Sequence, residues 1–407
     1  MEPDRLYTKA FFIALIYNFL IALNFTNNAI YPLYITQVGG SAAIVGLFIG
    51  VYSLAAFLGK PVIGPLIDRF GIQPILIFGS LCIALPPIGY LVFLDQGLHP
   101  LIWVLRIIQG FGFGAHFTAF FTLAARTAPY GRRNESIAMY GISGLAGNLI
   151  GPVLGEWLTA TQGLAIFFIV MTLIGLGGTI SALFLRTTGR KKSKGFSLRT
   201  LTAALKTREL RFPLILAPLL SMSFAAPVIF LAPLATARGL QGFSLYFTGF
   251  AVAGITIRLI GKKWGDQIGW RRILIPSFII YAAGLWLIFF SPNLLILGIA
   301  GFLSGNAQGL AFPAVTSLGY TLAPEDAKGS AMALITGTMD LGVFITGIIL
   351  GMIADRAGYG IIFPVASIAP LIGAFLVIIN VLKYPGRFSA RFAENIPRVV
   401  GFRSLPR

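Results

Sequence analysis

Long apolar runs dominate this chain of 407 residues and decide which folds it can adopt. Hydrophobic residues make up 57% of it and charged residues only 11%, whereas a soluble domain carries about 25% charged residues. The runs are about 20 residues or longer, which is the length of a membrane-spanning helix. A membrane barrel would instead show alternating segments of about ten residues. The sequence therefore predicts an all-α membrane protein.

The apolar runs divide into twelve candidate membrane-spanning helices. We predict them over residues 9–33, 43–65, 73–94, 100–126, 136–160, 163–185, 212–236, 244–262, 272–290, 293–321, 329–354 and 360–383. Lys and Arg gather in alternate loops, and such an excess marks the cytoplasmic side. The predicted cytoplasmic set is Arg5, Lys9, Lys60, Arg69, Arg126, Arg132, Arg133, Lys262, Lys263, Arg271, Arg272 and Lys328, against Arg238 and Arg356 in the opposite loops. We therefore expect both termini to be cytoplasmic, in the plasma membrane or in the inner membrane of a Gram-negative cell.

Several classes of protein are disfavoured by the sequence. The net charge of +18 comes largely from the cytoplasmic loops, the linker and the tail, so it does not indicate nucleic-acid binding. The single Cys82 cannot form an intrachain disulfide, and His/Cys metal spacing is absent from the sequence. Neither a Walker A pattern nor a Gly-x-Ser-x-Gly elbow occurs. We expect no enzyme activity, no cofactor and no metal.

Two charged turns of similar pattern lie 198 residues apart, almost half the chain length. They read Gly64-Pro-Leu-Ile-Asp68-Arg69-Phe-Gly71 and Lys262-Lys-Trp-Gly-Asp266-Gln-Ile-Gly269. A turn repeated once per half is typical of an alternating-access transporter built from two similar bundles. We predict an N-terminal six-helix bundle (1–186), a basic cytoplasmic linker (187–211), a C-terminal six-helix bundle (212–383) and a basic cytoplasmic tail (384–407). The linker is either a short amphipathic helix on the inner leaflet or a charged tether.

The first turn resembles the signature cytoplasmic loop between helices 2 and 3 of the major facilitator superfamily. The resemblance implies that family's fold, with twelve transmembrane helices in two pseudo-symmetric six-helix bundles. It also implies a conformational latch, in which the aspartate meets the start of helix 11 in the outward-facing state. The latch residues would be Gly64, Asp68, Arg69, Gly71, Asp266, Gly269 and Arg271. Ile72-Gln73 replaces the basic pair that usually follows the last glycine in the family.

Arg106 lies inside the fourth apolar run, in Leu105-Arg106-Ile-Ile-Gln109-Gly110. Near the bilayer centre such a charge costs roughly 2.5–3.5 kcal/mol, so we expect it to face protein or water. The segment resembles the helix 4 motif of the superfamily, whose arginine is linked to proton coupling. The alternative is a structural arginine near the outer interface that extends toward water.

Glycines recur every four residues on the fifth run, at Gly147, Gly151 and Gly155, and Pro152 bends the helix. The segment resembles the helix 5 antiporter motif of the 12-helix drug:proton antiporter branch, whose members usually export. Glu156 stands where the family usually has another glycine. The alternative is a packing groove that says nothing about the direction of transport.

Asp340 is a carboxylate near the middle of the eleventh run. An acid in this setting is a candidate for proton coupling. The other candidates are Arg106, which we expect to lie near Asp340, and Glu156 and His116. The alternative for Asp340 and His116 is a structural role as a hydrogen-bonded group. Tyr17, Asn24, Asn28 and Tyr31 follow one another at steps of 7, 4 and 3, which makes a polar stripe on one helical face. In the superfamily helices 1, 4, 7 and 10 line the central cavity. The candidate cavity residues are Tyr17, Asn24, Asn28, Tyr31, Gln109, Asn148, Asn306 and Gln308, each of which could instead make an interhelical hydrogen bond.

These observations predict a secondary active transporter that works by alternating access. The favoured activity is proton-coupled export of a small, partly hydrophobic compound, driven by the proton gradient. The alternatives are an importer or uniporter of a sugar or carboxylate, and a non-transporting sensor or lipid-handling scaffold. The expected partners are a small-molecule substrate and membrane lipid, without nucleic acid, and the expected state is a monomer.

Overall fold

A computed structural model describes residues 6–127, 133–185, 206–261, 264, 268–324 and 328–383. Helices are the regular secondary structure of these residues. Nine helices in the described ranges are long and apolar enough to span a membrane, and one of the nine, Lys328–Lys383, covers two crossings. The helix α11 (Ser244–Ile260) is apolar but shorter. Together with α7 (Arg133–Thr161), these elements account for twelve crossings.

The N-terminal half contains the first six crossings, two of which are interrupted. The first is α1, η1 and α2 in sequence, and the third is α4 followed by α5. The bounds are α1 (Lys9–Thr26), η1 (Asn27–Ala29), α2 (Tyr31–Gln37), α3 (Ala42–Phe70), α4 (Ile72–Ala84), α5 (Pro86–Val92), α6 (Leu101–Thr127), α7 (Arg133–Thr161) and α8 (Gly163–Leu183). The break between α4 and α5 falls at Pro86 and Pro87, which lack a backbone N–H and cannot continue the preceding hydrogen-bond ladder.

The C-terminal half contains the other six crossings. The bounds are η2 (Arg208–Leu210), α10 (Arg211–Ala237), α11 (Ser244–Ile260), α13 (Trp270–Phe290), α14 (Leu294–Leu322), α15 (Lys328–Ala366) and α16 (Ile368–Lys383). Gly358 interrupts α15 with a φ of 79°, a left-handed conformation that glycine adopts readily. The eleventh crossing therefore ends at this glycine, and the twelfth begins immediately after it.

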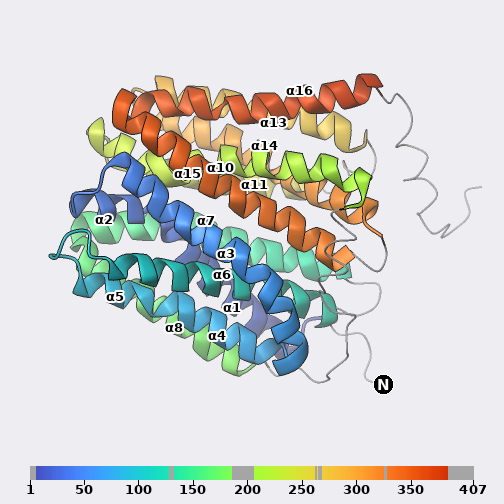
Figure 1. Cartoon of the computed structure of the whole chain (residues 1–407), viewed down its shortest axis with the longest axis horizontal. Helices are drawn as coiled ribbons and strands as arrows, with labels where there is room; N and C mark the ends of the chain where they lie inside the picture. The colour runs from blue at the N-terminus through green and yellow to red at the C-terminus, as the bar shows by residue number, and fades with distance from the viewer. Residues whose placement is uncertain are drawn as a thin grey trace, which may run out of the picture.

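The two halves form two layers of helices that lie side by side (Figure 1). The blue-to-green helices α1–α8 make one layer, and the yellow-to-red helices α10–α16 make the other. We call the end at which α1 begins (Lys9) and α16 finishes (Lys383) the inner end. The opposite end, where α2 and α5 lie on the left of Figure 1, is the outer end.

The halves meet along two antiparallel helix pairs, α3 with α15 and α7 with α11, and where α10 packs on η1 and α2. On the first pair the backbones approach closely, because Gly46 faces Gly347 so tightly that a Cβ on either would meet the other's carbonyl group. Gly351 likewise lies against the backbone of Ala42 and Ala43. Small residues permit such close contact between membrane helices.

One expected position is wrong. The second crossing was predicted to end at residue 65 with Lys60 at the cytoplasmic face, but α3 continues to Phe70. Lys60 is therefore ten residues from the end of the helix and is buried. The first charged turn is correspondingly short: Gly64 and Asp68 belong to the last turns of α3, and only Gly71, with a φ of 95°, leaves the helix.

Candidate functional site

The interface between α3 and α15 contains a buried ion pair. Lys60 Nζ lies 2.5 Å from Asp340 Oδ2, and the side chains are 5% and 16% exposed. The ring of Phe117 on α6 lies beside the ammonium group, 5.2 Å from Nζ to the ring centre. The two halves are thus joined by a pair of opposite charges that are largely shielded from solvent. The sequence indicated Asp340 but placed Arg106 beside it; the structure places Lys60 there instead.

Arg106 on α6 is fully buried inside the N-terminal bundle. Its guanidinium donates from Nε to the Phe48 carbonyl (3.0 Å), from Nη1 to Gln109 Oε1 (2.8 Å) and from Nη2 to Asn28 Oδ1 (2.7 Å). The rings of Tyr31, Phe48 and Tyr52 surround it at 4.4–5.0 Å from the guanidinium carbon. Among the described residues, Asp340 pairs with Lys60, and no hydrogen bond or ion pair joins it to Arg106.

The polar stripe of the first crossing turns toward the N-terminal bundle itself. Tyr17 OH lies 2.9 Å from His116 Nδ1 and donates to the Leu76 carbonyl, and Asn24 Nδ2 donates to the Met171 carbonyl (2.8 Å). Gln109 Nε2 donates to Tyr31 OH (3.2 Å). The 3-10 turn at η1 also interrupts the continuous helix on which the spacing argument depended. The described contacts of Tyr17, Asn24 and His116 are interhelical hydrogen bonds within one bundle.

The remaining cavity candidates are Asn306, Gln308 and Asn148, and their side chains make few of the described hydrogen bonds. Asn306 on α14 donates to the carbonyl of Phe302 within its own helix (3.0 Å). Gln308, also on α14, has a buried Oε1 without a hydrogen-bond partner in the described part of the chain. Asn148 on α7 is partly exposed. Of the predicted cavity residues, Gln308 is thus the one with a buried acceptor left to bind a donor.

The glycines of the helix 5 motif pack α7 against the first crossing. A Cβ on Gly147 would meet α1 at Ala22 and Leu23, and one on Gly151 would meet Thr26. Gly155 lies against Asn27 of η1 in the same way, and Pro152 is buried within α7. The spacing of four residues therefore produces the packing groove that the sequence predicted.

Glu156 follows this groove at the outer end of α7, and its carboxylate reaches the other half of the molecule. Oε1 accepts from the backbone N–H groups of Gly242 (2.7 Å) and Phe243 (3.0 Å), and Oε2 from that of Ser244 (2.8 Å). These groups are the start of α11. In the described part of the chain, the hydrogen bonds of Glu156 go to this segment and none joins it to Asp340, Arg106 or His116.

The latch residues that the structure describes lie at the inner end. Asp68 and Arg69 are exposed on the last turn of α3, and Gly269 adopts a φ of 81° before α13. Arg271 Nη2 donates to Asn380 Oδ1 on α16 (3.1 Å). Asp266 lies outside the described residues, and both copies of the latch stay predictions.

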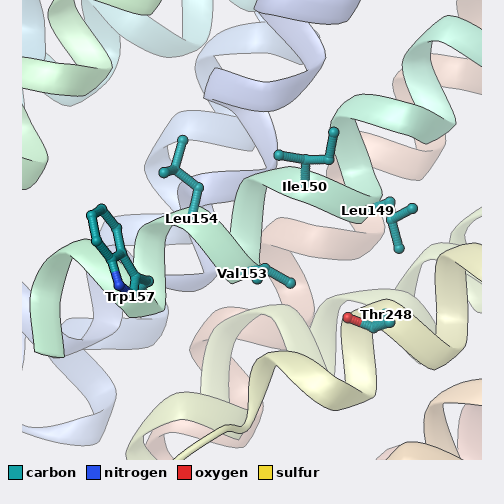
Figure 2. Close-up of a pocket in the computed structure, with 6 residues that line it drawn as sticks. All are labelled: Leu149, Ile150, Val153, Leu154, Trp157 and Thr248. Atoms are coloured by element: carbon teal, nitrogen blue, oxygen red, sulfur yellow. The ribbon is translucent and has the colours of Figure 1, made fainter.

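A pocket of about 520 Å³ lies between α7 and α11. Figure 2 shows its lining, with Thr248 contributed by α11 and the rest by α7: Leu149, Ile150, Val153, Leu154 and Trp157. Ile150, Val153 and Trp157 are exposed, so the pocket opens on the flank of the molecule. The lining is apolar and contains none of the residues predicted from the sequence.

Comparison with known proteins decides the family. The model of the Major Facilitator Superfamily matches residues 13–261 and 219–404, which is nearly the whole chain. This chain belongs to the major facilitator superfamily. It is therefore a multi-pass membrane transporter and not an enzyme, and a transporter of this superfamily binds a small-molecule substrate.

Its relatives include exporters and resistance proteins. The staphylopine export protein of Staphylococcus aureus (strain Mu50 / ATCC 700699) is 23% identical over 90% of this chain and 94% of its own length. The multidrug resistance protein MdtG of Enterobacter lignolyticus (strain SCF1) is 28% identical, covering 84% of this chain and 85% of its own. A solved structure of the nucleoside transporter NupG superposes with a TM-score of 0.76 at 13% identity, over 91% of this chain and 99% of that one.

Proposed function

We propose that this transporter exports a small, partly hydrophobic compound in exchange for protons. The observation that carries the proposal is the Lys60–Asp340 pair, which is buried where α3 of one half meets α15 of the other. An alternating-access cycle moves the halves relative to each other, so any change in the charge of this pair acts directly on the moving interface.

The chemistry of coupling follows from the cost of unpaired charge. While Asp340 is ionised, it neutralises Lys60 in a setting with little water. A proton on the carboxylate leaves the ammonium without a counter-charge, and removing one partner of a buried pair costs about 3–5 kcal/mol. That energy favours a conformation in which Lys60 reaches water. A cation or hydrogen-bond donor on the substrate can replace the proton at Asp340, so the two bind alternately.

The direction and the cargo each rest on two further observations. The similar staphylopine export protein and MdtG are named for export and resistance, and the segment from Gly147 to Gly155 resembles the helix 5 motif of the antiporter branch. Asp340 is the sole carboxylate near the middle of a predicted span, and the pocket on the flank is apolar. An interior with so few charges suits a neutral or amphipathic compound better than a polyanion.

The experiment is transport by purified protein in proteoliposomes. A thermal-shift screen of hydrophobic compounds first selects a binder, because a ligand that binds the native state stabilises it by mass action. The labelled binder is then followed with and without an imposed pH gradient. Asp340→Asn should abolish accumulation driven by the gradient while leaving downhill exchange of the compound, because the variant cannot exchange a proton.

The matched control is Asp95→Asn, which removes an exposed carboxylate from the loop before α6. It should transport as the unmodified protein does. Full uphill, pH-dependent transport by Asp340→Asn would show that the proton is carried elsewhere. Accumulation in the opposite direction would contradict export.

A further inference from the structure

Two carboxylates cross from one half of the molecule to the other at the outer end. Glu156 of α7 accepts three backbone N–H groups at the start of α11, at 2.7–3.0 Å. Asp355 of α15 accepts two backbone N–H groups and one hydroxyl at the start of α3: Oδ1 accepts from Ala42 N (2.7 Å), and Oδ2 accepts from Ala43 N (3.1 Å) and from Ser41 Oγ (2.8 Å). Each acid thus caps a helix of the opposite half.

The two caps are related by the internal duplication. Glu156 and Asp355 lie 199 residues apart, and the capped segments, which begin at Ser41 and Gly242, lie 201 residues apart. The N-terminal half therefore supplies one acid and receives the other. A contact that occurs twice, in reciprocal directions, is a property of the paired bundles and not of one local turn.

The physical basis is the polarity of a helix end. The first N–H groups of a helix lack partners within it, and the aligned peptide dipoles make that end attractive to an anion. The capping residue of α11, Phe243, has no side chain that can accept these bonds, whereas Ser41 of α3 caps its own helix at 3.5 Å to Ile44 N. Glu156 is also the less exposed of the two acids, since Asp355 is exposed. Water therefore competes less at Glu156.

We propose that Glu156 and Asp355 form an outer gate that holds the outer ends of the two bundles together. All six hydrogen bonds join groups on different halves, so they exist only while the outer ends are in contact. Rocking the bundles apart must break all of them and expose both helix termini to water. The gate thus selects the outer-closed state, and this role of Glu156 replaces its predicted role in proton coupling.

Of the two gate residues, Asp355 lies in a recognisable sequence pattern. Gly351-Met-Ile-Ala-Asp355-Arg356-Ala-Gly358 has the same spacing of glycine, aspartate and arginine as the turn from Gly64 to Gly71. Gly358 ends its helix with a left-handed φ of 79°, as Gly71 does with 95°. The pattern therefore ends both α3 and the eleventh crossing, at opposite ends of one antiparallel pair.

Distances across the outer end test the gate, and the measurement needs no substrate. In a Cys82→Ser background, spin labels are placed at the exposed positions Gln37→Cys and Pro292→Cys, one in each half. Pulsed electron paramagnetic resonance then measures the distribution of the distance between them. Glu156→Gln keeps the side-chain volume but removes the charge, and it should increase the ratio of outer-open to outer-closed molecules about 10-fold. Asp355→Asn should have a smaller effect, and the double variant a larger one.

Labels at Lys9→Cys and Lys383→Cys report on the inner end, where the same variants should shorten the distance. Asp95→Asn, the exposed acid also used as the control above, should change neither distance. An outer distance in the double variant equal to that of the parent would overturn the gate. If the double variant does not fold, as judged by size-exclusion chromatography, the Glu156→Gln single variant decides by the same criterion. The result is independent of whether Asp340 carries the proton.

Discussion

The guanidinium group of Arg106 connects three segments of the N-terminal bundle by hydrogen bonds. Its hydrogen bonds reach the Phe48 carbonyl on α3, Asn28 on η1 and Gln109 on its own helix, and each uses a different nitrogen. The planar fork also lies against three aromatic rings. This geometry depends on the shape of arginine, because lysine presents a single compact ammonium group on a flexible stem.

Arg106→Lys should therefore be damaging although it keeps the charge. The ammonium cannot reach all three acceptors, and each buried polar group left unpaired costs about 1–3 kcal/mol. We expect a lower Tm, measured by differential scanning fluorimetry, and at least a 10-fold loss of transport. Arg356→Lys, at an exposed arginine, is the control and should stay within about 0.5 kcal/mol of the parent. A variant with unchanged Tm would mean that the hydrogen bonds of Arg106 contribute little.

Only one of the two residues in the Lys60–Asp340 ion pair could be identified from the sequence. Asp340 was identifiable because an acid in the middle of an apolar run stands out without any structure. Lys60 was not, because the apolar run predicted a helix end at residue 65, and a lysine near a helix end is ordinary. Only the continuation of α3 to Phe70 places it in the interior. Contacts between residues 280 positions apart also require the fold, which local patterns do not contain.

Among the elements, the pair α3 and α15 is packed by glycine backbones rather than by large side chains. Gly347 faces Gly46, and a Cβ on Gly347 would overlap the carbonyl group of that residue. Helix propensity alone would favour alanine over glycine by about 1 kcal/mol. The close approach of the two halves is therefore the reason for glycine at this position.

Gly347→Ala adds a methyl group that raises helix propensity but overlaps the neighbouring backbone, and we expect the overlap to dominate. Forcing extra atoms into a tight contact costs about 1–3 kcal/mol, so we expect lower thermal stability and a longer distance between Gln37 and Pro292 labels. Gly141→Ala on α7 is the control, because a Cβ there has nothing within 4 Å. It should be neutral or slightly stabilising. Equal behaviour of the two variants would contradict close packing of α3 on α15.

The elements themselves were largely predictable, since apolar runs report directly which segments cross the membrane. The interruptions were not. Asn28 belongs to the predicted helical stripe, yet the chain forms a 3-10 turn over Asn27–Ala29, where Asn27 Nδ2 and Asn28 Nδ2 donate to backbone carbonyls of the preceding turn. Periodicity identified the polar face of the first crossing but not the bundle core toward which that face turns.

For the whole molecule, the duplicated turns predicted two bundles, and the structure contains them. The contacts between the bundles could not be predicted, because the hydrogen-bonded residues that make them are separated by 86 to 314 positions along the chain. Alternating access treats each bundle as a rigid body that moves against the other. Bonds within a bundle should then be harmless to transport, whereas a bond between the bundles should stop it.

Two matched cross-links test this directly. Ser41 Oγ and Asp355 Oδ2 lie 2.8 Å apart across the bundles, and Asn18 Nδ2 and Ser143 Oγ lie 2.8 Å apart within one bundle. In the Cys82→Ser background, Ser41→Cys with Asp355→Cys should lose transport when oxidised and recover it when a reductant is added. Asn18→Cys with Ser143→Cys, oxidised to the same extent, should transport equally in both redox states. Uninterrupted transport through a fully oxidised 41–355 pair would mean that the outer ends need not separate.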